Sequence, residues 1–209
     1  MKIISGNSQI LTPVFFNDEL ASDFLTADTL VTFSVNMTNA VGTDAHAFDS
    51  VNDHVYVNGI FGFVGWDPTS LAGFELTNNP VGSKIHTLEV LVPKNNPLRL
   101  TYKYSINGAD NEAANNVNHV RYIRQTGTYA LPLDTFGNAV VEPLVGGLTI
   151  GSPSAGSVPI TWLGRPGVHL QSSTSLNGPW QDYANTDGLS STNWPVGSGS
   201  LFFRLIKPF

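Results

Sequence analysis

The chain has 209 residues and a formal net charge of −6, with 41% hydrophobic residues and only 12% charged ones. This apolar content is sufficient for a folded core, while the ten Lys and Arg residues are dispersed, which argues against nucleic acid or an anionic membrane surface as a partner. There is no cysteine, so disulfides, thiolate metal sites and cysteine nucleophiles are excluded.

The first 28 residues carry no clear pattern. Residues 10–16 fit either an edge strand or a linker, and the residues after them are acidic. Residues 1–16 lack the continuous apolar segment of a signal peptide, and no stretch of 18 residues is apolar enough to span a membrane. We predict an N-terminal segment or linker over residues 1–28, no membrane partner, and a chain that is cytoplasmic or a piece of a longer exported protein.

Alternation of apolar and polar residues begins at residue 29 and predicts β-strands. In the first strand Val31, Phe33 and Val35 alternate with small polar residues. The same pattern predicts strands at residues 54–59, 87–93, 98–104, 120–123 and 128–131. Short strands separated by loops, with no helical period, predict an all-β fold, an antiparallel β-sandwich of the immunoglobulin-like kind over residues 29–142.

Glycine and proline punctuate residues 143–153 and predict a domain boundary near residues 140–147. Beyond it, strands are predicted at residues 158–162, 168–172, 180–183, 191–194 and 201–206. We therefore expect a second, smaller β-domain over residues 147–209. A block of this size builds only a small core, so we expect it to lean on the first domain.

The chain contains no phosphate-binding glycine loop, zinc-binding helix motif or nucleophile elbow. Asp44, His46, Asp53 and His54 lie in one polar loop, which we interpret as solvated and not as a metal site, so no metal or other cofactor is expected. A pair of catalytic carboxylates has no sequence signature, and one among the five glutamates stays an alternative. Arg165 and His169 flank a turn and are predicted to face solvent.

Trp66 stands in a turn-rich loop, between Gly65 and Asp67-Pro68. Such an indole either covers the core or stays exposed as a flat platform, and the sequence leaves both open. An exposed indole face stacks well on the apolar face of a sugar ring. The other three tryptophans, Trp162, Trp180 and Trp194, are predicted to pack in the core of the second domain.

The order of segments in residues 29–135 is recognisable. It runs through residues 31–37, 55–59, Gly65-Trp66-Asp67-Pro68, residues 100–104, and a polar stretch from residue 111 to 121. This order resembles the starch-binding domains of carbohydrate-binding module family 20 and the related glycogen-binding modules. In that family a Trp after a Gly, a Lys in a Tyr-Lys strand and a second Trp before a Glu form the main sugar site.

The resemblance implies where a ligand would bind. Trp66 and Lys103 match the first two family positions, whereas Asn111 stands at the third and has no aromatic face. Glu112 follows it, and Asn116 stands in for the family's hydrogen-bonding Asn. These five residues are the expected ligand-binding set, for an α-glucan or another polysaccharide.

Residues 148–209 are similar to a C-terminal β module found at the ends of large exported, multimodular proteins of environmental bacteria. This similarity implies a bacterial protein that is secreted or at the cell surface, with upstream domains as partners. The expected function is therefore a non-catalytic carbohydrate-binding module. The alternatives are a structural, adhesion or assembly module without sugar binding, and a metal-dependent polysaccharide-active enzyme.

Overall fold

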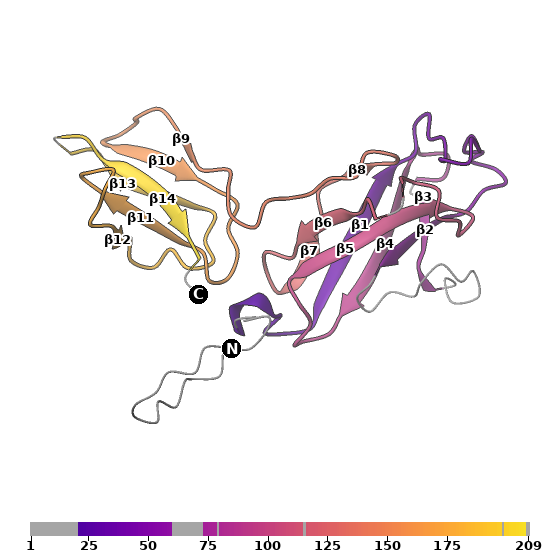
Figure 1. The fold of residues 1–209 in the computed structure, drawn as a ribbon, viewed down its shortest axis with the longest axis horizontal. Coiled ribbons are helices and arrows are strands. Elements are labelled where there is room, and N and C mark those ends of the chain that lie inside the picture. Colours follow the sequence, from indigo (N-terminus) through magenta and orange to yellow (C-terminus); the bar gives the residue numbers. More distant parts are fainter. Residues whose placement is uncertain (1–20, 60–72, 79, 115, 198, 208–209) are drawn as a thin grey trace, which may run out of the picture.

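The computed structural model describes residues 21–59, 73–78, 80–114, 116–197 and 199–207. In this part of the chain the regular elements are strands and one short 3-10 turn, η1 (Ala21–Asp23), so the all-β prediction is confirmed. Figure 1 shows a large β module and a smaller one, joined by the chain between β8 and β9. Within the described ranges no helix is long and apolar enough to cross a membrane.

The large module is a curled sheet with the strand order β6-β5-β2-β3-β4-β1-β7, and β8 pairs with β1. Its strands are β1 (Thr29–Asn36), β2 (Val55–Gly59), β3 (Glu75–Asn78), β4 (Ile85–Val92), β5 (Arg99–Ile106), β6 (His119–Tyr122), β7 (Gly127–Ala130) and β8 (Asp134–Thr135). The two pairings of β1 with β7 and β8 are parallel and the others are antiparallel. The sandwich is thus built from a mixed sheet and not from antiparallel pairs alone.

The sheet curls so that its two halves face each other. β3 pairs with β2 on one side and with β4 on the other, and so passes from one half to the next. Phe33 of β1 and Tyr102 of β5 are far apart in the strand order, yet their ring centroids lie 5.1 Å apart in a T-shaped contact. The space between the halves is filled by apolar side chains, which form one continuous core.

The alternation in β1 explains its place in this core. Val31, Phe33 and Val35 are fully buried, whereas the residues between them are half-buried. The β4–β5 turn is also as the sequence predicts, since Asn95 adopts a positive φ of 66°, a conformation that Asn tolerates well. β5 differs, because from Leu100 to its end nearly every side chain is buried, including those between the apolar positions.

The small module contains two three-stranded sheets, in the orders β13-β10-β9 and β12-β11-β14. All five strands predicted beyond residue 147 are present. The strands are β9 (Thr149–Ile150), β10 (Ser157–Thr161), β11 (His169–Ser173), β12 (Gln181–Asp182), β13 (Ser191–Pro195) and β14 (Phe202–Ile206). Ile160, Trp162, Val168 and Leu170 form its core, and Trp194 packs against them.

Trp180 differs from the other tryptophans of the small module. It is half-buried and lies under the guanidinium of Arg204, whose central carbon is 4.4 Å from the ring centroid. The predicted core packing is confirmed for Trp162, which is 4% exposed, and for Trp194, which packs against the core, whereas Trp180 is not part of the core cluster.

Arg165 of the small module contacts residues of the large module and of the segment before β1. Arg165 is only 1% exposed, so its predicted solvent-facing position is wrong. Its Nη2 donates to Asp23 Oδ1 at 2.6 Å, and its guanidinium lies 4.8 Å from the ring centroid of Tyr122 on β6. Leu25, inside the predicted linker, is buried in the core of the large module. The pairing with Asp23 and the contact with the Tyr122 ring offset part of the cost of burying this cation.

Candidate functional site

Three of the five predicted ligand-binding residues come together around β5 and the loop that follows it. Lys103 lies on β5, and Asn111 and Glu112 lie in the loop of residues 107–118 that leads to β6. Asn116 lies in the same loop and is exposed, with a positive φ of 67°. Trp66 lies outside the described residues.

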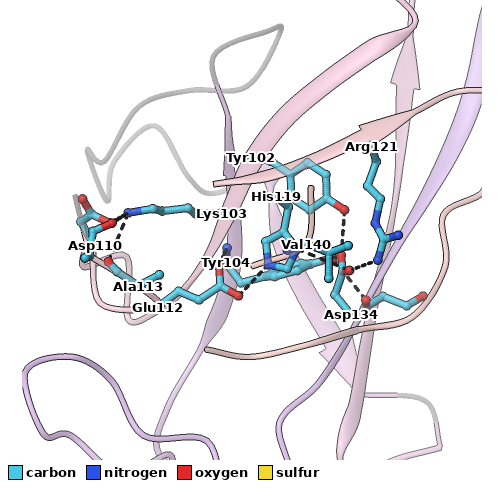
Figure 2. A network of polar contacts seen from close by, with 12 residues as sticks. Tyr102, Lys103, Tyr104, Asp110, Glu112, Ala113, His119, Arg121, Asp134 and Val140 are labelled. Carbon is cyan, nitrogen blue, oxygen red and sulfur yellow. Dashed lines mark hydrogen bonds and ion pairs between the residues drawn. The ribbon is translucent and has the colours of Figure 1, made fainter. Parts of the chain in front are cut away.

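Lys103 anchors the loop through its ammonium group. Its side chain is 2% exposed, and its Nζ donates to Asp110 Oδ1 at 2.8 Å. The same Nζ donates to the carbonyl oxygens of Ala113 and Ala114, at 3.2 and 3.1 Å (Figure 2). The ammonium group is thus bound to three loop atoms, a role that holds the loop in one conformation.

Asn111 continues the strand pairing at the end of β5. Its Oδ1 accepts from the Ile106 amide at 2.9 Å, and its Nδ2 donates to the Ile106 carbonyl at 3.2 Å. The side-chain amide therefore makes the two hydrogen bonds to Ile106 that the backbone of a neighbouring strand would otherwise make. Because both of its polar atoms are engaged with the backbone and the residue is 3% exposed, its position is a structural one.

Glu112 points into the interior. Its Oε2 accepts from the Tyr104 amide at 2.7 Å, and its Oε1 lies 2.9 Å from Nε2 of His119 on β6. Both side chains are fully buried. This contact links the loop to a second set of polar residues, which the sequence analysis did not single out.

Asp134 of β8 is the centre of that second set (Figure 2). Its Oδ1 accepts from Arg121 Nη2 at 2.5 Å and lies 3.4 Å from His119 Nδ1. Its Oδ2 accepts from the hydroxyls of Tyr102 and Tyr104, at 2.7 and 3.2 Å. We call Glu112, His119, Asp134, Arg121, Tyr102 and Tyr104 the buried polar network.

Charge inside this network is shared between two carboxylates and two cations. Burial alone would lower the pKa of His119, but its hydrogen bonds to Asp134 and Glu112 and their negative charges raise it to about 9. Burial would raise the pKa of Asp134, but His119 and Arg121 hold it at about 2. At neutral pH His119 is an imidazolium between two carboxylates, and deprotonation would make Nδ1 an acceptor for the Val140 amide, 3.3 Å away.

The network is suited to hold strands together. His119 and Arg121 belong to β6, Tyr102 and Tyr104 to β5, and Asp134 to β8, so five side chains connect three strands. His119, Glu112 and Asp134 have no exposed side-chain surface. Their polar atoms bind each other, which favours a structural role over acid–base chemistry on an external substrate.

The described residues on either side of the segment that carries Trp66 belong to β2 or are bound to it. Asn58 and Gly59 of β2 pair with Lys103 and Tyr102 of β5, and the chain then leaves the described residues. The described chain resumes at Gly73, and the carbonyl of Phe74 accepts from the Val57 amide at 3.0 Å. Both ends of the segment are therefore fixed to β2, next to the strand that carries Lys103.

The two histidines of the polar loop of residues 42–54 bind different carboxylates. His46 Nε2 lies 2.7 Å from Asp53 Oδ2, and His54 Nδ1 lies 2.7 Å from Glu75 Oε1. Each histidine therefore has its own carboxylate. Over the described ranges, no group of three or more His, Asp or Glu side chains is placed to hold a metal ion.

Comparisons with protein-family models, with curated proteins and with solved structures found no match to this chain. The likeness to starch-binding modules therefore rests on the sequence segments quoted above. The signal for the buried polar network was weak, since His119 and Arg121 alternate in an ordinary strand pattern and Asp134 lies in a strand of two residues.

Proposed function

We propose that the chain is a non-catalytic carbohydrate-binding part of a secreted or cell-surface protein, and that it binds an α-glucan or another polysaccharide. The observation that carries the proposal is the joint anchoring of two chain segments at β2 and β5. Lys103 fixes the loop of residues 107–118, and its strand partner Asn58 precedes the segment that carries Trp66. Sugar recognition combines an aromatic platform with polar groups held around it, and the proposal takes Trp66 as that platform.

The chemistry of the surface supports the same proposal. With 12% charged residues, the chain relies on small neutral polar groups such as Asn116, which is exposed on the loop. Neutral amides and hydroxyls are suited to the hydroxyls of a polysaccharide. The loop supplies no aromatic residue at Asn111, so the proposed site has one stacking platform, and modest affinity is expected from it.

A specific observation supports a structural function as the second candidate. The side chains of Lys103, Asn111 and Glu112 all form hydrogen bonds inside the protein. Such bonds stabilise the fold, which is what a spacer or assembly module needs. In that case the two modules serve to hold upstream domains in place, and Trp66 is a core residue.

Affinity gels with soluble starch, cyclic glucans, xylan and mixed-linkage β-glucan separate the two candidates. The whole chain should be retarded by at least one polysaccharide, and Trp66→Ala should abolish the retardation. Trp180→Ala, the same change in the small module, is the matched control and should leave it unchanged. Well-folded protein that no polysaccharide retards would overturn the proposal in favour of the structural function.

A further inference from the structure

The chain contains three Asn-Gly pairs, Asn58-Gly59, Asn107-Gly108 and Asn177-Gly178. In such a pair the backbone nitrogen of the glycine can attack the side-chain carbonyl carbon of the asparagine, because glycine has no Cβ that blocks the approach. The sequence alone does not distinguish the three pairs. The structure distinguishes them by the hydrogen bonds that hold the two reacting groups and by the exposure of these groups to water.

Asn58 is held inside the sheet of the large module. It lies in β2 and is 3% exposed, and its Oδ1 accepts from the Ser105 hydroxyl at 2.9 Å. Gly59 pairs with Tyr102 of β5 in the same sheet. Both reacting groups are therefore fixed, and the attack requires β2 to leave the sheet.

Asn107 is exposed, but three hydrogen bonds hold it to the residues before β2. Its backbone nitrogen donates to the His54 carbonyl at 2.8 Å, and its Oδ1 accepts from the His54 amide at 2.9 Å. Its Nδ2 donates to Asp53 Oδ1 at 2.7 Å. Gly108, which would supply the attacking nitrogen, is buried. The side chain can turn toward Gly108 only after its two hydrogen bonds break, so the reaction is slowed.

Asn177 lies in the exposed loop between β11 and β12, and no described residue binds its side-chain amide. Its backbone nitrogen donates to Ser175 Oγ at 3.3 Å, and the Gly178 nitrogen donates to the Ser175 carbonyl at 3.1 Å. Among the described residues, this one bond in an exposed turn restrains the attacking nitrogen. The side chain is free to turn toward it, and water reaches the loop.

We propose that Asn177 is the site at which the folded chain deamidates, ahead of Asn107 and Asn58. The Gly178 nitrogen loses its proton and forms a bond to Asn177 Cγ, the Cγ–Nδ2 bond breaks, and ammonia leaves with that proton. Water then opens the resulting cyclic imide at either carbonyl carbon and leaves an aspartate or an isoaspartate. The reaction consumes only water and involves no sugar, so it goes beyond the proposed function.

The product changes the small module in two ways. A carboxylate replaces a neutral amide, so the chain gains one negative charge. An isoaspartate also lengthens the main chain by one carbon immediately before Gly178. A Cβ on Gly178 would lie 3.1 Å from Trp180 Cδ1, so the turn is packed closely against the indole. The longer turn should therefore move Trp180 and the short strand β12 that follows it.

Peptide mapping by mass spectrometry tests the proposal in the intact chain. The chain is incubated in mildly alkaline buffer made with oxygen-18 water, which marks each conversion that occurs during the incubation. Asn177 should convert first, to aspartate and isoaspartate together, and Asn107 should convert at least about tenfold more slowly. In urea the three pairs should convert at similar rates, because the bonds that distinguish them are lost. Conversion of Asn107 or Asn58 as fast as Asn177 in the folded chain, or no conversion of Asn177 there, would overturn the proposal.

A pair of variants tests whether hydrogen bonds set the order of conversion. Asp53→Ala frees the side chain of Asn107 and should raise its rate of conversion several-fold. Asp182→Ala removes an exposed carboxylate from the small module and should leave the rate at Asn107 unchanged. Equal rates at Asn107 in these two variants would contradict the protection on which the proposed order depends.

The structural consequence has its own control. Asn177→Gln removes the site, because glutamine would have to close a larger ring. Incubation of the native chain should give a second NMR signal for the Trp180 indole N–H, and incubation of Asn177→Gln should not. A second signal in both proteins would assign the change at Trp180 to another residue and contradict the proposal.

Discussion

His119 Nε2 and Glu112 Oε1 lie 2.9 Å apart, and neither side chain has any exposed surface. The contact joins the loop after β5 to β6, and through His119 to Asp134 on β8. A buried charge is stable only while its partners remain, so removing one member is costly. The network therefore makes the stability of the large module depend on pH and on each of its members.

The first prediction concerns that pH dependence. The folded pKa of His119, about 9, is raised above its ordinary 6.5, so its contribution is complete below pH 6.5 and is lost as pH rises through 9. The folded pKa of Asp134, about 2, is depressed below 3.8, so its contribution is complete above pH 3.8 and is lost as pH falls through 2. The free energy of unfolding should be greatest between these windows and fall by on the order of 3 kcal/mol by pH 9. Urea unfolding across this pH range measures it.

Two histidine variants serve as the control for this profile. His119→Gln should remove most of the decrease in the free energy of unfolding between pH 6.5 and 9. His46→Gln changes a histidine whose side chain is 46% exposed, so this variant should keep most of that decrease. A slope that survives in His119→Gln would assign the pH dependence to other groups.

The second prediction removes one charge of the network. Glu112→Gln keeps the shape of the side chain but leaves His119 with one carboxylate and the Tyr104 amide with a weaker acceptor. We expect a loss of about 3–5 kcal/mol in the free energy of unfolding. Glu89→Gln, an exposed change on β4, should alter it by less than about 0.5 kcal/mol. Denaturant unfolding of both variants is the measurement, and equal stability would show that the carboxylate charge is dispensable.

The third prediction concerns the loop that Lys103 anchors. Lys103→Met removes the donor from Asp110 and from the carbonyls of Ala113 and Ala114. Leaving these acceptors without their partner should cost about 1–3 kcal/mol and loosen residues 107–118. Hydrogen exchange of the loop amides should quicken by a corresponding factor. Lys94→Met, an exposed change in the turn before β5, should leave exchange in the loop unchanged.

Alternating patterns in the sequence were sufficient to find most strands but not their partners. The alternation of Val31, Phe33 and Val35 correctly predicted β1 and its buried face. It carried no information on the parallel pairing of β1 with β7 and β8, because strand partners depend on contacts distant in sequence. The short strands β3, β8 and β9 were missed, because four, two and two residues are too few to show a period.

The candidate site was predictable only in part, for a related reason. Lys103 and Arg165 are long charged side chains, which are rarely buried fully, yet they are 2% and 1% exposed. Each is stabilised by partners that lie elsewhere in the chain, such as Asp23 for Arg165. The resemblance predicted that Lys103, Asn111 and Glu112 lie close together. It did not predict the hydrogen bonds that these side chains make inside the protein.

The fourth prediction separates the modules. Asp23 accepts from Arg165 at 2.6 Å and from Lys207, so Asp23→Asn leaves a buried guanidinium without its charge partner. Among the residues that the structure describes, two buried nitrogens of Arg165 already find no hydrogen-bond partner, so the loss of Asp23 would leave this cation still less compensated. X-ray scattering should show a larger radius of gyration, and proteases should cut residues 137–148 faster. Asp182→Asn, within the small module, should change neither; if Asp23→Asn behaves like it, other contacts hold the modules together.

The last prediction tests a close backbone approach at the same junction. A Cβ at Gly164 would lie 2.1 Å from the Leu189 carbonyl oxygen and 2.8 Å from the Ser190 nitrogen, and backbone atoms do not yield as a flexible side chain does. Gly164→Ala should therefore destabilise the small module by about 2–3 kcal/mol. Gly197→Ala is the matched control, because its Cβ would meet nothing within 4 Å. Tryptophan fluorescence during urea unfolding follows this module, which holds three of the four tryptophans. Equal midpoints for the two variants would mean that the backbone at Leu189 moves aside at little cost in free energy.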